Sequence, residues 1–309
     1  MEMSSNQQEY ICVIGAVNVD IIASSYVRLI QKDSNPGSVS ISYGGVGRNI
    51  AENLCRLNQR VELITVLGDD VHADEISGQC SDLGISLKHS LKVKGEYSSM
   101  YICINDEKGE MQMAVSVMEI CDRLTPEYFK TKLDVINGAT AVIMDLNMSA
   151  PSVKYLCEHV TVPMFIDPVS TRKALKIKPC LKNVYAIKPN LMEAELILGR
   201  KIKTDEEILS AAQRFLQLGV QRVFISLGSQ GVCYADKNEA GFVRPQKARI
   251  VNTTGCGDAF SAGMVVGFVQ NKSIRECAEM GQRASRICLQ TNQAVSDKMN
   301  LKEVLGEGE

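Results

Sequence analysis

Two glycines, one small residue and a carboxylate stand together at Gly255-Cys256-Gly257-Asp258, directly before a long apolar run. A helix that begins here leaves backbone N–H groups unpaired and carries the positive end of its dipole. Because glycine lets the backbone approach an anion closely, Gly255, Cys256 and Gly257 can surround a phosphoryl group. Asp258 would then act as general base toward an attacking hydroxyl. A plain glycine turn with Asp258 as its N-cap explains this stretch alone equally well.

Short apolar runs that end in small or polar residues recur along the chain and predict parallel strands. The first is Tyr10–Gly15, which places Asn18 and Asp20 just beyond its carboxyl end, although Asp20 can equally cap a turn. Ligands of open α/β sheets bind at this edge, so we expect one α/β domain over residues 1–309 with its site there. Four later runs follow the same pattern: Ala141–Asp145 with Asn147 beyond it, Met164–Asp167, Tyr185–Lys188, and Arg222–Ser226 with Gly228 beyond it.

Two further motifs precede predicted helices. Gly44-Gly45-Val46-Gly47-Arg48-Asn49 is a glycine cluster that offers a second set of backbone N–H groups and the Asn49 amide, but alone it is a weak signal. Asn190 and Glu193 lie one helical turn apart and can hold a hydrated Mg²⁺ through water. The commoner role of an acid at the position of Glu193 is to complement the helix dipole.

A different pattern marks two segments at about residues 23–43 and 95–118. Ser38–Tyr43 alternates with period two, and two more alternating runs flank the turn Asp106–Gly109 as a hairpin. Together they predict a small antiparallel β-sheet set apart from the main sheet, forming a lid that covers a ligand and excludes water. A plain sheet extension, or a contact between two copies in a homodimer, explains the same pattern.

Composition excludes several classes of protein. A net charge of −2 and the absence of Trp argue against nucleic acid as a partner. Eleven scattered cysteines predict free thiols in a reducing compartment, and the separated histidines give no zinc motif. The polar N-terminus and the lack of a long apolar stretch predict a cytoplasmic protein without a membrane segment. Walker A, dinucleotide-binding and protein-kinase motifs are missing.

Taken together, these motifs resemble the ribokinase-like, PfkB-type carbohydrate and nucleoside kinases over nearly the whole chain. The resemblance rests on Asn252–Asp258, on Gly44–Asn49 and on the Asn-x-x-Glu pair Asn190 and Glu193. It implies a ribokinase-like α/β fold, ATP as co-substrate, Mg²⁺, a small-molecule acceptor, and Asp258 as base beside the anion hole Gly255–Gly257. The implied acceptor-binding residues are Asn18, Asp20, Gly44, Gly45, Asn49, Ser98 and Asn147, and the implied nucleotide-binding residues are Lys188, Asn190, Ser226, Gly228, Thr253 and Asn292.

Within the family, Asp167–Ser170 and Lys188–Asn190 resemble the group that acts on pseudouridine. This implies transfer of the γ-phosphoryl group to the 5′-hydroxyl of pseudouridine, with Asp20 on the ribose hydroxyls and Ser98 near the uracil edge. Ribose or another nucleoside is the alternative acceptor, and a non-catalytic metabolite-binding regulator on the same fold is the alternative of another class. The chain departs from the family pattern at four residues. Cys256 replaces the commoner alanine, and Tyr97 and Val117 stand where smaller or polar residues are expected near the base. Asn252 replaces an aspartate that is associated with a monovalent cation in many relatives, so potassium activation stays open.

Overall fold

The computed structural model describes residues 9–245 and 249–307. In this part of the chain, nine strands form a sheet in the order β15-β14-β13-β12-β11-β10-β1-β4-β6. All neighbouring pairs are parallel except β13–β14 and β14–β15. The strands are β1 (Ile11–Ile14), β4 (Val61–Ile64), β6 (Ile85–Ser86), β10 (Ala141–Asp145), β11 (Met164–Asp167), β12 (Ala186–Ile187), β13 (Arg222–Ser226), β14 (Val232–Ala235) and β15 (Ala240–Val243).

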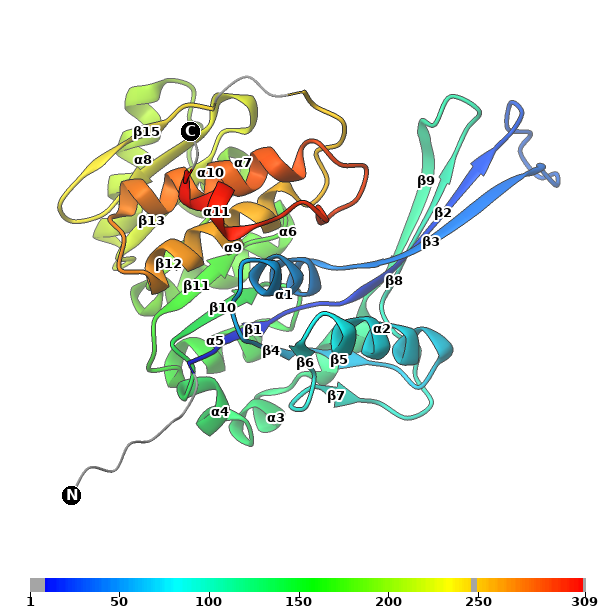
Figure 1. The fold of residues 1–309 in the computed structure, drawn as a ribbon, viewed down its shortest axis with the longest axis horizontal. Helices are drawn as coiled ribbons and strands as arrows, with labels where there is room; N and C mark the ends of the chain where they lie inside the picture. Colours follow the sequence, from blue (N-terminus) through cyan, green and yellow to red (C-terminus); the bar gives the residue numbers. More distant parts are fainter. Residues whose placement is uncertain (1–8, 246–248, 308–309) are drawn as a thin grey trace.

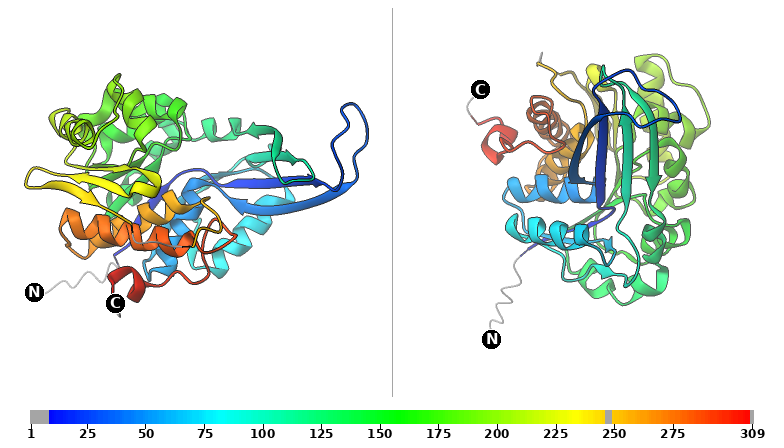
Figure 2. Two further views of the ribbon diagram at one scale, coloured as in Figure 1. Left: turned by 90° about the horizontal axis from the view of Figure 1, so that it is seen from above. Right: turned by 90° about the vertical axis from the view of Figure 1, so that its right-hand side faces the viewer.

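Helices cover both faces of this sheet (Figure 2). Successive strand residues point to opposite faces, so Cys12 and Ile14 of β1 join one apolar core and Ile11 and Val13 join the other. The Ile11 side is covered by α1 (Val46–Arg56), α2 (Val71–Asp82), α9 (Cys256–Val269), α10 (Ile274–Cys288) and α11 (Leu301–Leu305). The Cys12 side is covered by η1 (Glu119–Arg123), α3 (Pro126–Lys130), α4 (Leu133–Asn137), α5 (Ala150–His159), α6 (Thr171–Ala174), η2 (Leu175–Asn183), α7 (Leu191–Leu198) and α8 (Asp205–Gln217).

A second sheet of four strands projects from the body of the molecule and forms the lid (Figure 1). Its order is β3-β2-β8-β9; the β2–β8 pair is parallel and the other pairs are antiparallel. The strands are β2 (Asn18–Ser25), β3 (Gly37–Gly44), β8 (Met100–Asn105) and β9 (Met111–Val117). The remaining short elements are β5 (Val66–Leu67), β7 (Leu91–Lys92) and η3 (Gly228–Gln230).

The structure confirms the mainly parallel sheet with a small β lid and corrects several details. Strands Ala141–Asp145, Met164–Asp167 and Arg222–Ser226 have the predicted bounds. Asn18 and Asp20 lie just beyond the carboxyl end of β1, as predicted, but they already belong to β2, a strand that was not predicted to begin there; only three residues separate β1 from β2. The hairpin β14–β15 at the sheet edge was not predicted.

Two expectations from composition can also be compared with the structure. All eleven cysteines are free, as their spacing predicted. Within the described residues, no helix has both the length and the apolar character required to cross a bilayer.

Candidate active site

Three charged side chains gather at the carboxyl edge of the main sheet. Asp145 ends β10 and Asp167 ends β11, and the two residues are direct neighbours in the parallel register. Lys188 follows β12, and its Nζ lies 3.1 Å from Asp167 Oδ2. Burial alone would lower the pKa of Lys188. The nearby carboxylates of Asp167 and Asp258 raise it by more than burial lowers it, so the pKa of Lys188 lies above its usual value. Lys188 is therefore a buried cation held at this edge.

The start of α9 lies beside that cation. Gly255 is the N-cap, with φ of 79°, and a side chain there would overlap the carbonyl oxygen of Ala294. Within the described residues, the N–H groups of Gly257 and Asp258 donate to no backbone carbonyl oxygen. A Cβ on Gly257 would lie 3.3 Å from Lys188 Nζ. Bare N–H groups, the positive helix end and a lysine thus converge on Gly255–Gly257, which we call the anion cradle.

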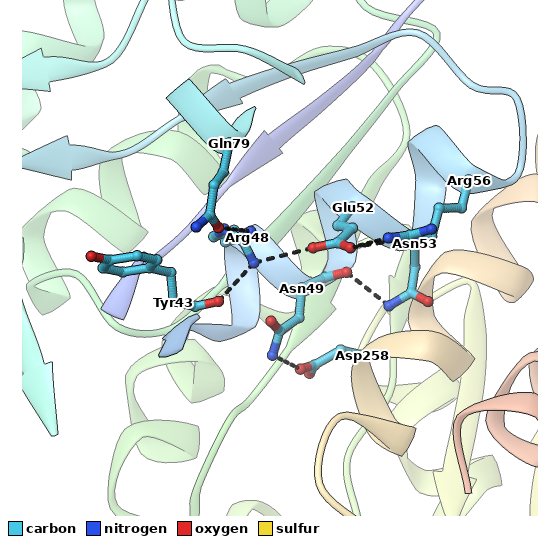
Figure 3. Close-up of polar contacts among 8 residues, drawn as sticks. All are labelled: Tyr43, Arg48, Asn49, Glu52, Asn53, Arg56, Gln79 and Asp258. Carbon is cyan, nitrogen blue, oxygen red and sulfur yellow. Dashed lines mark hydrogen bonds and ion pairs between the residues drawn. The ribbon is translucent and has the colours of Figure 1, made fainter. Parts of the chain in front are cut away.

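Asp258 is the third residue of α9 and is only 9% exposed. Its Oδ2 accepts a hydrogen bond of 2.9 Å from Asn49 Nδ2, which reaches it from the first turn of α1 (Figure 3). Burial, together with the charge of Asp167, raises the pKa of Asp258 to about 7, although the hydrogen bond from Asn49 and the charge of Lys188 act in the opposite direction. The carboxyl group therefore changes its charge near neutral pH, where a general base is most effective.

A cluster of side-chain oxygens lies on the other side of Asn49. Asn18 Nδ2 donates to Asp20 Oδ1 at 2.7 Å, and a Cβ on Gly44 would lie 2.7 Å from Asp20 Oδ2 and 3.8 Å from Asn49 Oδ1. The buried oxygens Asn18 Oδ1 and Asn49 Oδ1 have no hydrogen-bond donor in the described part of the chain. Burial raises the pKa of Asp20, and its hydrogen bond from Asn18 opposes this. Unpaired buried acceptors fit a ligand that brings hydroxyl donors.

Arg48 joins the lid to this cluster, a role that no sequence pattern indicated. Its guanidinium donates to the carbonyl oxygen of Tyr43 in β3 at 2.7 Å and to Gln79 in α2 at 3.1 Å. It also pairs with Glu52, which binds Arg56 (Figure 3). The network fixes the end of β3 next to the helix turn that carries Asn49.

Asn190 and Glu193 do not form an open metal site. Each side chain caps the backbone of the other: Asn190 Oδ1 accepts from the Glu193 N–H, and Glu193 Oε2 accepts from the Asn190 N–H. No cluster of three His, Cys, Asp or Glu side chains in the described residues can hold a metal ion. The Glu193 carboxylate still has lone pairs for water, so the pair fits a hydrated Mg²⁺ held through its water shell and not one that is directly coordinated.

The residues predicted for the nucleotide are spread along the same edge. Asn190 pairs with Ser226 as an isolated β-bridge, and Gly228 opens η3 with φ of 58°. The side-chain amide of Asn252 accepts a hydrogen bond from the Thr254 N–H and donates one to the carbonyl oxygen of Asn292, so it links the loop before α9 to Asn292. Asn292 lines a cavity of about 510 Å³ together with Arg249, Val251, Ile287, Gln290, Thr291, Gln293, Ser296, Asp297, Lys298 and Glu303.

Two predicted acceptor-binding residues have their polar groups engaged elsewhere. The backbone N–H of Ser98 donates to Asp70 Oδ2 at 2.6 Å, and Ser98 Oγ accepts from the Gly68 N–H at 3.1 Å. Asn147 hydrogen bonds to Lys173, and its N–H donates to Asp145. Asp145 and Asp167 were missed as site residues, although their place at the ends of adjacent predicted strands was the available signal.

A ribokinase-like α/β body with a β lid and a site at its carboxyl edge defines the class of the protein. Residues 8–300 match the model of the pfkB family carbohydrate kinases, and the chain belongs to this family. Kinases of this family are ATP-dependent phosphotransferases.

Comparison with individual proteins gives the same assignment. The chain is 32% identical to the pseudouridine kinase of Escherichia coli over 97% of this chain and 96% of that protein. A solved structure from Clostridium perfringens, described as a candidate sugar kinase, is 30% identical with a TM-score of 0.89 and covers 97% of this chain and 95% of its own. The ribokinase of Arabidopsis thaliana, complexed with ribose and ATP, has a TM-score of 0.85 at 22% identity, covering 96% and 98%, and shows the shared fold.

Proposed function

We propose that the protein transfers the γ-phosphoryl group of ATP to the 5′-hydroxyl of pseudouridine, giving pseudouridine 5′-phosphate. The observation that carries the proposal is the arrangement of Asp258, a buried carboxyl group with a pKa near 7, between the anion cradle and the unpaired oxygen of Asn49. The choice of pseudouridine is supported by the 32% identity to a pseudouridine kinase.

In the proposed mechanism, Asp258 accepts the proton of the acceptor hydroxyl as its oxygen attacks the γ-phosphorus. Asn49 holds the carboxylate in place through its 2.9 Å hydrogen bond. The N–H groups of the anion cradle and the Lys188 ammonium stabilise the negative charge on the transferred group. Lys188 is buried, and the N–H groups are held by the first turn of α9, so little reorganisation is required in the transition state.

Acceptor selection follows from the oxygen cluster. Asn18 Oδ1, Asn49 Oδ1 and the Asp20 carboxylate accept hydrogen bonds from ribose hydroxyls. A ligand that lacks a hydroxyl leaves a buried oxygen unpaired, which costs about 1–3 kcal/mol for each group. We assign the uracil edge to the root of the lid, near Ser98 and Asn147. To contact the base, these two residues must give up hydrogen bonds that they now make within the protein.

The nucleotide lies along the edge from Asn190 to the cavity beside Asn292. Ser226, Gly228 and Thr253 contact ATP, and the cavity receives its base. Asn190 and Glu193 hold Mg²⁺ through its water shell, and the ion, when bound, supplies positive charge to the phosphate oxygens. Activation by a monovalent cation near Asn252 stays a prediction.

The test is ATP turnover with pseudouridine, uridine, ribose and adenosine, measured under identical conditions. We expect the highest kcat/KM with pseudouridine. Faster turnover with ribose would overturn the assigned acceptor and favour the sugar-kinase alternative. Binding of a nucleoside by calorimetry without turnover of any acceptor would favour the non-catalytic regulator.

A further inference from the structure

Two thiols meet at the base of the anion cradle. Cys256 is the first residue of α9 and is partly exposed, whereas Cys288 is the last residue of α10 and is fully buried. Each thiol is close enough to shift the pKa of the other, and Cys256 Sγ donates to the carbonyl oxygen of Asn252 at 3.9 Å. Cys288 Sγ also donates to the carbonyl oxygen of Thr254 at 3.5 Å, within the loop that leads into the cradle. The two cysteines are therefore adjacent although 32 positions separate them in sequence.

Cys256 has the properties of a reactive cysteine. Its pKa is lowered by the hydrogen bond from the Cys288 thiol, while burial and the charge of Asp258 act in the opposite direction. The positive end of α9 favours a thiolate at this position. By contrast, burial raises the pKa of the thiols of Cys121 and Cys277 to about 11. Cys256 thus combines partial exposure with thiolate character, the two conditions that direct thiol oxidation.

We propose that Cys256 is a site of reversible oxidation by hydrogen peroxide and that it forms a disulfide with Cys288, which inactivates the anion cradle. The Cys256 thiolate attacks one peroxide oxygen, the O–O bond breaks, and a sulfenic acid and hydroxide form. The Cys288 sulfur then attacks the Cys256 sulfur, the S–O bond breaks, and water leaves with the Cys288 proton. In sum, two thiols are oxidised, and one peroxide is reduced to two waters.

The bond affects the cradle because the surrounding backbone is closely packed. Ser285 Oγ of α10 donates to the carbonyl oxygen of Cys256 at 2.7 Å, and Gly255 lies against Ala294. A disulfide draws the first turn of α9 toward the end of α10 and shifts the N–H groups of Gly257 and Asp258. A displacement of about 1 Å at a catalytic site can reduce turnover about 100-fold. The loss of turnover rests on the proposed function, whereas formation of the disulfide does not.

Peptide mapping tests the pairing directly. Trypsin releases Cys256 in the peptide 250–272 and Cys288 in the peptide 287–298, each with a single cysteine. After treatment of the full-length protein with hydrogen peroxide and alkylation of the remaining thiols, we expect these two peptides to be disulfide-linked. Kinase activity should fall at least about tenfold and return with dithiothreitol. The absence of the linked peptide, or a linked protein with full activity, would overturn the proposal.

Two variants distinguish the Cys256–Cys288 disulfide from oxidation elsewhere in the protein. Cys288→Ala should keep the activity of the untreated protein and lack the linked peptide, so that Cys256 oxidises further and dithiothreitol no longer restores activity. The matched control is Cys157→Ala, because Cys157 in α5 and Cys180 in η2 are another pair of thiols that shift each other's pKa. It should behave like the wild type in both assays. If the untreated protein phosphorylates no acceptor, the proposed function fails, while the mapping still decides the thiol pairing.

Discussion

The carboxyl edge of the main sheet and the lid differ in what their side chains contact. At the edge, Asp167, Lys188 and Asp258 are buried, and each has a charged or hydrogen-bonding partner within the protein. In the lid, all residues of β9 are exposed. The edge is therefore organised for chemistry before any ligand arrives, whereas the lid offers surfaces for something that is still to bind.

The lid has two unlike faces, which follow from its strand register. One face is apolar, and the neighbouring partners across its four strands are Ile41, Ile21, Ile102 and Val115. The opposite face is polar, and the neighbouring partners across its four strands are Ser42, Asp20, Tyr101 and Ser116. Since Asp20 belongs to the oxygen cluster, the polar face is directed at the acceptor. We propose that the apolar face pairs with a second copy of the chain.

The largest effect is expected from Asp258→Asn, which keeps the shape of the side chain and removes the base. We expect kcat to fall about 10²–10⁴-fold, while the dissociation constants of ATP and acceptor stay within a few-fold of wild type. Turnover and calorimetry on the same preparation measure both. Retention of full turnover would show that another group takes the proton.

Replacement of the edge cation comes second. Lys188→Met should lower kcat about 10²–10³-fold, because a fixed donor to the transferred group is lost. The same change leaves Asp167 as an unpaired buried charge and should destabilise the protein by about 3–5 kcal/mol.

The double variant Asp167→Asn with Lys188→Met serves as the control for Lys188. It should recover much of the stability in thermal unfolding without recovering kcat. Recovery of both would assign Lys188 a purely structural role.

A smaller effect is expected at the root of the lid. Asp20→Asn should raise the KM for the acceptor about 10–100-fold and leave the KM for ATP unchanged, because the acceptor hydroxyls lose a charged acceptor. Ser24→Ala, in the same strand, is the matched control. Equal changes in both KM values would contradict the separation of lid and edge.

The pH dependence sharpens the description of the edge. Because Asp258 must be deprotonated to act as base, kcat/KM should rise with pH up to about pH 7 and then level off. Its folded pKa is above the unfolded value of about 3.9, so the native state binds the extra proton and loses stability as pH rises between these values. Asp258→Asn should therefore unfold at a higher temperature than wild type at about pH 8, and the difference should shrink toward about pH 4. A constant difference would contradict the raised pKa.

The smallest effect on turnover is expected on the apolar face of the lid. Val115→Lys should convert the proposed dimer to a monomer in sedimentation velocity and change kcat less than about tenfold, since the chemistry lies at the edge. Ser116→Lys places the same charge on the polar face and should leave the dimer intact. A wild-type protein that sediments as a monomer would refute the pairing.

The sequence predicted the strands of the main sheet well because buried parallel strands are short, continuous apolar runs. It placed Asn18 and Asp20 correctly beyond the carboxyl end of the first strand. It did not predict that they open a second strand, because only three residues separate β1 from β2 and the polar positions of β2 resemble a strand exit. The alternative stated for Glu193 was an acid that complements the helix dipole. The structure places Glu193 in the first turn of α7, and it also shows a mutual cap with Asn190 that was not predicted.

Other features of the site depend on distant parts of the chain. The Asn49–Asp258 hydrogen bond joins residues 209 positions apart, and the Lys188–Asp167 pair depends on the order of β11 and β12 in the sheet. Local patterns carry no information on such pairings. The raised pKa of Asp258 arises from these contacts and from burial, and it could be found only with the fold in hand.

The most direct test of the account is a crystal structure with pseudouridine and a non-hydrolysable ATP analogue bound together. We predict that the 5′-oxygen lies within hydrogen-bond distance of an Asp258 carboxylate oxygen, and that the terminal phosphate contacts the N–H of Gly257. A 5′-oxygen directed away from Asp258, or a terminal phosphate outside the anion cradle, would contradict it.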